Sequence, residues 1–194
     1  MAKMEPMEPT EPLAIRKKTD KVVSTNLITI SSTHSFAEIK EAFERVIPPL
    51  DLTSYKTAVS TGDHNTARAA IQNLNLCKLY TFPPPRDFTA LLRTIDVVRQ
   101  AIVYEVGNPL VAAIMVQHNL DIALHMPRRV LVRVNADKVE LRADALAPLV
   151  AKYGNPQIDE IARQLDEGLT DLLRDIAGLF KIGEMVHEEN CNLQ

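Results

Sequence analysis

The chain has 194 residues, of which 46% are hydrophobic and 24% charged, and its formal net charge is −3. This composition fits one globular domain with a substantial core, and the negative charge provides no basic field for binding nucleic acid. Apolar runs are far shorter than the roughly 20 residues needed to cross a bilayer, which excludes a membrane-spanning protein.

The two ends of the chain differ in composition from its middle. Residues 1–20 contain Met-Glu-Pro twice, and because proline and charge both oppose packing we expect a disordered arm there. The N-terminus has no apolar segment of the signal-peptide type, and Cys77 and Cys191 are too few for a disulfide framework. We therefore expect a cytoplasmic protein with one domain over residues 21–180 and a flexible tail over 181–194.

The first part of the domain is predicted to alternate strands with helices. Residues 26–31 are rich in β-branched side chains and indicate a first strand. Ser35 to Glu38 has the spacing of a capping box, before a helix that Pro48-Pro49 ends. Residues 54–60 indicate a second strand, and an aspartate cap precedes a helix over 64–74.

The next elements have stronger apolar patterns. A short helix over 87–95 precedes a strand over 97–106, whose nearly continuous apolar residues indicate a central, buried position. An apolar helix over 110–119 follows this strand. Over 156–179, Ile and Leu recur at steps of three and four, which predicts the longest amphipathic helix of the chain.

Residues 129–143 predict a β-hairpin that turns at Ala136-Asp137. One register satisfies both faces of this hairpin, with apolar pairs on one side and an Arg–Glu pair on the other. The predicted pairs are Val134 with Val139, Val132 with Leu141, and Arg133 with Glu140.

Neighbouring antiparallel strands exclude a doubly wound parallel sheet. We expect an α+β fold, a two-layer sandwich in which a mixed or antiparallel sheet carries helices on one face, with a long C-terminal helix. The other sheet face, with Arg133 and Glu140, would then need water or a second subunit.

The run Tyr104–Pro109, between the buried strand and the apolar helix, is the candidate ligand site. Gly107 permits close backbone approach, and Asn108 can cap the helix. The free N–H groups and positive dipole end of this helix could bind an anionic or carbonyl ligand, although capping alone also explains the triplet. Glu105 at the strand end is a further ligand contact, and Met115 belongs either to the pocket wall or to the core.

Three side chains are candidates for proton transfer. His118 and His125 lie seven residues apart and could act as acid–base groups near neutral pH, with Tyr104 as the third candidate. Purely structural roles for all three are the alternative. The histidine spacing is not that of a metal site, and no phosphate loop or dinucleotide fingerprint occurs, so we expect neither a metal nor a cofactor.

Several motifs stand in a recognisable order: Gly107-Asn108-Pro109, then Met115, then Leu124-His125-Met126-Pro127-Arg128-Arg129-Val130-Leu131-Val132. This order resembles the domain-of-unknown-function 302 family, over roughly residues 25–150. Fungal-type members of that family often continue into a C-terminal helix such as 159–173 here. The chain departs from the family pattern by inserting residues 78–96, by having Met-Pro where relatives have Leu-Pro, and by lacking a Tyr-Asp pair after the last strand. The resemblance implies an α+β fold, often dimeric, and no established reaction.

Three functions remain open from these residues. The first is a homodimeric protein that binds a small organic molecule in a largely apolar pocket near Gly107–Met115. The second makes this pocket a cofactor-free lyase, isomerase or cyclase, in which His or Tyr moves a proton while the helix end stabilises enolate-like charge. The third is a structural or interaction protein whose long C-terminal helix forms the dimer contact.

Overall fold

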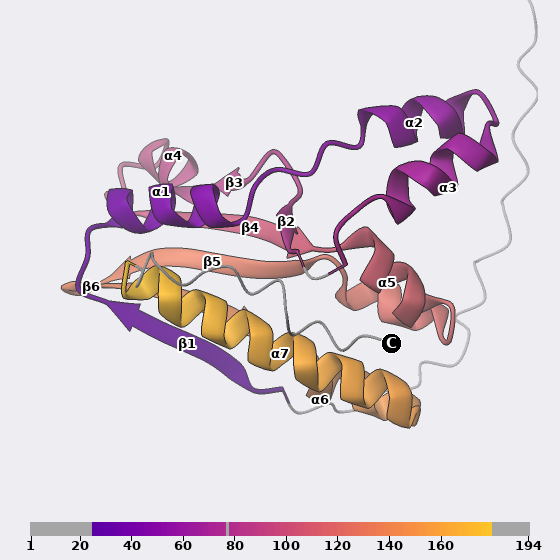
Figure 1. Ribbon diagram of the computed structural model, residues 1–194. Coiled ribbons are helices and arrows are strands. Elements are labelled where there is room, and N and C mark those ends of the chain that lie inside the picture. The colour runs from indigo at the N-terminus through magenta and orange to yellow at the C-terminus, as the bar shows by residue number, and fades with distance from the viewer. Residues whose placement is uncertain (1–24, 77, 180–194) are drawn as a thin grey trace, which may run out of the picture.

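The computed structural model describes residues 25–76 and 78–179, so the expected arm (1–20) and tail (181–194) lie outside the described residues (Figure 1). The fold is built on a six-stranded sheet in the order β1-β6-β5-β4-β2, with β3 also pairing with β4. Every strand pairing is antiparallel, which confirms the predicted fold class. The strands are β1 (Leu27–Ser32), β2 (Tyr80–Thr81), β3 (Arg86–Asp87), β4 (Ala101–Gly107), β5 (Arg128–Asn135) and β6 (Lys138–Asp144).

The hairpin β5–β6 has the predicted register, with Val134 opposite Val139 and Val132 opposite Leu141. Ala136 in its turn has a positive φ of 54°, as a two-residue hairpin turn demands. The predicted charged pair also forms, and one Arg133 nitrogen lies 2.8 Å from a Glu140 carboxylate oxygen.

Nine helical segments accompany the sheet in the described residues. The predicted N-terminal caps of two helices are confirmed. Ser35 and Glu38 form the capping box of α1, and Asp63 caps α3. The segments are α1 (Phe36–Val46), α2 (Thr53–Ser60), α3 (His64–Gln72), α4 (Phe88–Arg93), α5 (Pro109–Val116), η1 (Leu120–His125), α6 (Ala147–Val150), η2 (Ala151–Tyr153) and α7 (Pro156–Ala177).

The strand predicted over 54–60 is wrong, because this segment forms helix α2. Its β-branched residues suit a strand, but α2 lies beside α3, beyond the end of the sheet, where no strand edge is available to it (Figure 1). The Asp51 carboxylate accepts a hydrogen bond from the Thr53 amide and so starts the helix locally. Contact with α3 and burial of Ala58 then stabilise it.

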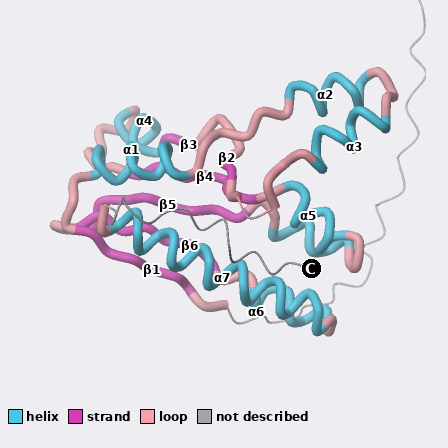
Figure 2. Tube along the Cα trace, in the orientation of Figure 1, coloured by secondary structure: helices cyan, strands magenta, loops and turns pink. Residues whose placement is uncertain are grey.

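Helices α1 and α7 cover one face of the sheet, visible in Figure 2 as cyan coils beside the magenta strands. Their apolar residues pack on alternate residues of the strands to form the main core, which includes Phe43, Tyr104, Val132, Leu141 and Leu173. A second core joins α5, η1, α6 and the first half of α7. No helix in the described part of the chain is long and apolar enough to span a bilayer.

The opposite side of the sheet carries the other set of alternate residues, and we call it the open face. Val103 and Leu131 lie opposite each other at its centre, and Leu131 is in turn opposite Arg142. The open face has a mixed apolar and charged character, and its side chains are partly or fully exposed: Thr29, Ser31, Val103, Glu105, Arg129, Leu131, Arg133, Glu140 and Arg142.

Candidate functional site

A groove of about 310 Å³ lies on the open face, where β4 ends and β5 begins. Its floor contains Glu105 and Arg129, which are opposite each other on β4 and β5. The β5–β6 register pairs Val130 with Ala143. The next residue of β6, Asp144, therefore lies beside Arg129. Walls come from η1 and α6, and the lining residues are Arg86, Glu105, Leu124, His125, Met126, Pro127, Arg128, Arg129, Asp144, Leu146 and Leu149.

The two charged side chains on the floor, Glu105 and Arg129, differ in whether they have a partner in the described residues. One Arg86 nitrogen lies 2.9 Å from Glu105, so these two side chains form an exposed ion pair. The Arg129 side chain is exposed and makes no hydrogen bond or ion pair with any residue in the described ranges. By register it lies between Glu105 on β4 and Asp144 on β6, in a groove whose lining also includes Leu124, a residue that is 80% exposed. The groove thus combines an available guanidinium with an apolar surface.

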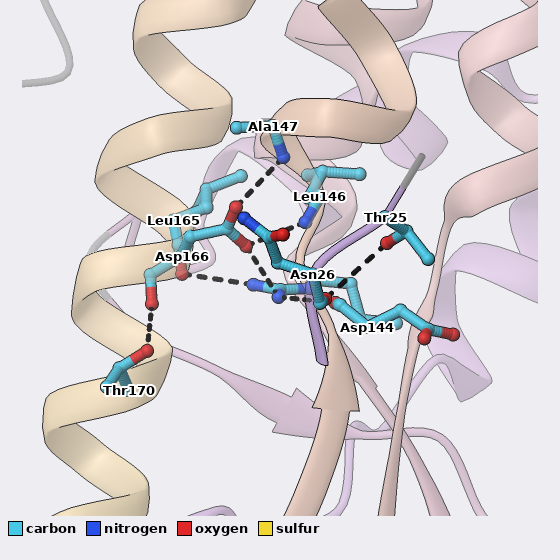
Figure 3. A network of polar contacts seen from close by, with 9 residues as sticks. Thr25, Asn26, Asp144, Leu146, Ala147, Leu165, Asp166 and Thr170 are labelled. Atoms are coloured by element: carbon cyan, nitrogen blue, oxygen red, sulfur yellow. Dashed lines mark hydrogen bonds and ion pairs between the residues drawn. The ribbon is translucent and has the colours of Figure 1, made fainter. Parts of the chain in front are cut away.

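Arg128, which lines the groove, forms a buried ion pair with Asp166, and Figure 3 shows the polar contacts around Asp166. An Arg128 nitrogen lies 2.7 Å from Asp166, and the same guanidinium donates to the backbone carbonyls of Leu165 and Asp144. Burial lowers the pKa of Arg128, whereas the neighbouring Asp166 raises it in part. These contacts hold the start of β5, the end of β6 and helix α7 together, so the groove has a rigid inner wall.

His125 lies in the wall of the groove beside two residues that the sequence did not suggest. Its Nε2 atom is 3.4 Å from Lys152 Nζ and 3.5 Å from the Tyr153 hydroxyl. Burial, and then the Lys152 charge, lower the pKa of His125, so its imidazole is neutral at pH 7. The three side chains come from η1 and η2, far apart in sequence, and no local pattern connects them.

Of the residues predicted for the site, the structure brings Glu105 and His125 together in the groove. Gly107 lies just outside, and a Cβ at this position would be 3.7 Å from Pro127 Cβ, which is ordinary packing. His118 follows the end of α5 and is exposed, away from the groove lining. Met115 is fully buried in the second core.

Tyr104 faces the helix side of the sheet, opposite to the groove. It is 1% exposed, its ring stacks on Phe43 with 4.4 Å between centroids, and its hydroxyl donates to a Glu44 carboxylate oxygen at 2.9 Å. Burial, and then the Glu44 carboxylate, raise its pKa far above the usual value, so the phenol stays protonated. In the structure Tyr104 is a core residue.

Asn108 uses all of its polar atoms inside the protein. Its Oδ1 accepts from the Leu110 amide at 2.9 Å, and its Nδ2 donates to three backbone carbonyls of the segment 75–78. The side chain therefore occupies the first free amide of α5, that of Leu110, where the sequence suggested that a ligand could bind. Among the described residues, no group of three or more His, Cys, Asp or Glu side chains is arranged to hold a metal ion.

The fold and the groove define a small α+β protein with one long C-terminal helix and an open sheet face. Residues 65–176, more than half of the chain, match the family model described as domain of unknown function DUF302. The chain belongs to the DUF302 family.

One solved structure gives a direct comparison of the fold. It is the crystal structure of an uncharacterised conserved DUF302 protein from Bacillus stearothermophilus, with a TM-score of 0.54 and 16% sequence identity. The similarity covers 78% of this chain and 97% of the other, and at this identity it shows a shared fold. No curated protein matches the chain.

Proposed function

We propose that the protein binds a small organic acid in the groove on the open face. The observation that carries this proposal is Arg129, an exposed guanidinium without a partner in the described residues, beside the apolar wall that includes Leu124 and Leu149. A guanidinium binds a carboxylate through two parallel hydrogen bonds, and the wall would cover the apolar part of the same molecule.

This proposal places the ligand on the open face and not at the start of α5. Asn108 already satisfies the Leu110 amide at the start of that helix, whereas the groove offers charged groups that a ligand can reach. The expected site is accordingly more polar than the apolar pocket predicted from the sequence, although it adjoins the same strand end.

A second candidate function is acid–base catalysis on the bound acid, as in a cofactor-free lyase, isomerase or cyclase. The observation that favours it is His125, a neutral imidazole in the groove wall beside Lys152 and Tyr153. A neutral imidazole can accept a proton from a carbon next to a carbonyl group.

The test is a ligand-observed NMR titration of the full chain with short aliphatic and aromatic carboxylic acids, each compared with its neutral amide. We expect one or more acids to bind while the amides do not, and Arg129→Gln to weaken binding at least about tenfold. Arg133→Gln is the matched control, because Arg133 lies four residues along β5 on the same face but outside the groove.

Three outcomes of this titration contradict the proposal: no acid binds, the amides bind equally well, or both arginine variants weaken binding equally. In deuterated water the same samples test the second candidate. Exchange of the proton next to the carboxyl group, lost in His125→Gln while binding is kept, would support catalysis, and its absence would leave binding alone.

Two further features are part of the proposal. The long α7 favours a fungal-type member of the family, and the small number of cysteines supports a cytoplasmic location.

A further inference from the structure

The two edges of the sheet differ in the strands that form them. At one edge, β2 and β3 both pair with β4, and the Thr89 hydroxyl exchanges hydrogen bonds with the carbonyl and the amide of Ala101. At the other edge, β1 pairs with β6 on its inner side, and no residue in the described ranges pairs with its outer side (Figure 1). One edge ends in two strands of two residues each, whereas the other, which we call the open edge, is a strand of six residues.

The open edge lacks the features that usually prevent strands from joining. Leu27–Ser32 has no charged residue and no proline, and its six residues pair with β6 in an unbroken register without a bulge. Proteins commonly protect an exposed edge with lysine, proline or a bulge. An unprotected strand of this length is suited to pairing with another strand.

The register identifies which groups of β1 are available. The Ala145 amide donates to the Asn26 carbonyl at 2.8 Å, so residues 26, 28, 30 and 32 direct their backbone groups toward β6. Leu27, Thr29 and Ser31 therefore direct their amides and carbonyls outward. The same alternation of backbone direction holds between β5 and β4, where the Val134 amide of β5 donates to the carbonyl of Gln100, just before β4.

We propose that a second copy of this chain pairs antiparallel with β1 through these outward groups. A twofold axis at Thr29 sets Leu27 opposite Ser31 of the second copy and gives three hydrogen-bonded residue pairs, which is about six backbone hydrogen bonds. Thr29 lies opposite its own counterpart, where a neutral β-branched side chain is favourable. The sheets of the two copies would then form one continuous sheet across the dimer.

The same register explains the exposure of two apolar residues at the end of the main core. Ile28 and Ile30 point to the helix side but are only partly buried, since β1 is the last strand. In the paired form Ile28 faces Ile30 of the second copy, so each side chain covers the other. Burial of these side chains adds to the hydrogen bonds and favours this occupant over water.

The first test measures self-association of the full chain by sedimentation equilibrium. Thr29→Pro removes an outward amide that no described residue uses, and proline is tolerated on the free side of an edge strand. We expect a concentration-dependent dimer whose dissociation constant rises about 100-fold in Thr29→Pro, because two hydrogen bonds are lost across the axis. Thr29→Val is the matched control and keeps the dimer.

The second test uses hydrogen exchange and needs no variant. The amides of Leu27, Thr29 and Ser31 should be protected at high protein concentration and exposed on dilution, while those of Ile28 and Ile30 stay protected throughout. A monomer at every concentration overturns the proposal. So does a dimer that Thr29→Pro leaves intact, or protection of the outward amides that persists in the monomer, since the chain would then cover its own edge.

Discussion

Asp166 joins three elements through one carboxylate. It lies on α7, accepts from the Leu146 and Ala147 amides at the start of α6 at 2.8 and 2.9 Å, and pairs with Arg128 on β5 at 2.7 Å (Figure 3). Both members of the ion pair are largely buried, with side-chain exposures of 11% and 15%. Removal of the carboxylate would therefore leave a buried cation without its counter-ion and two amides without their acceptor.

We expect Asp166→Ala to lower the free energy of unfolding by about 3–5 kcal/mol, because breaking one half of a buried pair leaves the other charge desolvated. Urea denaturation at neutral pH measures the change. Asp171→Ala is the control on the same helix, since Asp171 pairs with Arg174 at the surface, where ion pairs contribute little. Equal effects of the two substitutions would mean that the buried pair has no special role.

Two Gly-Asn-Pro triplets begin helices in this chain, and they differ in what the asparagine does. Asn155 begins α7 and accepts from the Gln157 and Ile158 amides. Asn108 begins α5 in the same way, but it is buried and its amide group also holds three carbonyls of the segment 75–78. The same motif is a helix cap in one place and a tie between a helix and a loop in the other.

The two asparagines therefore provide a matched comparison of these roles. We expect Asn155→Ala to lower the free energy of unfolding by about 1 kcal/mol, the usual value for a lost cap. Asn108→Ala should lower it by about 2–4 kcal/mol, since three partly buried carbonyls also lose their donor. Thermal and urea unfolding of both variants measure the difference, and equal values would show that the contacts to segment 75–78 contribute nothing.

Across the whole molecule, the sequence predicts the structural features that are set by residues close to one another in the chain. The β5–β6 register and the caps at Ser35 and Asp63 follow from local patterns, and all three are confirmed. The strand predicted over 54–60 is wrong because the position of the segment beside α3, and not its composition, decides its structure.

The groove shows the same limit for the candidate site. The sequence predicts Glu105 because it lies at the end of the strand before the apolar helix, and His125 because an imidazole can transfer a proton near neutral pH. It does not predict Arg129, Lys152 and Tyr153, because only the sheet register and the contacts between η1 and η2 bring them to the groove and to His125. The sequence could not tell that Tyr104 faces the core, since alternation along a strand leaves the choice of face open.

The helix pair α2–α3 is the element least tied to the rest of the molecule. It lies beyond the end of the sheet (Figure 1), and within each of these helices a single alanine, Ala58 or Ala67, is buried. Neither the main core nor the second core has a buried member from this pair. We therefore expect α2–α3 to open locally while the sheet stays folded, since so little apolar surface is buried there.

Native-state hydrogen exchange at increasing urea concentrations measures this difference in stability. Amides of α2–α3 should exchange through an opening whose free energy is several kcal/mol below that of the β5–β6 amides and depends weakly on urea, as a small exposed surface requires. The β5–β6 amides should follow global unfolding, because both strands lie in the interior of the sheet. If both sets report the same free energy and the same urea dependence, the helix pair unfolds with the sheet and the expectation fails.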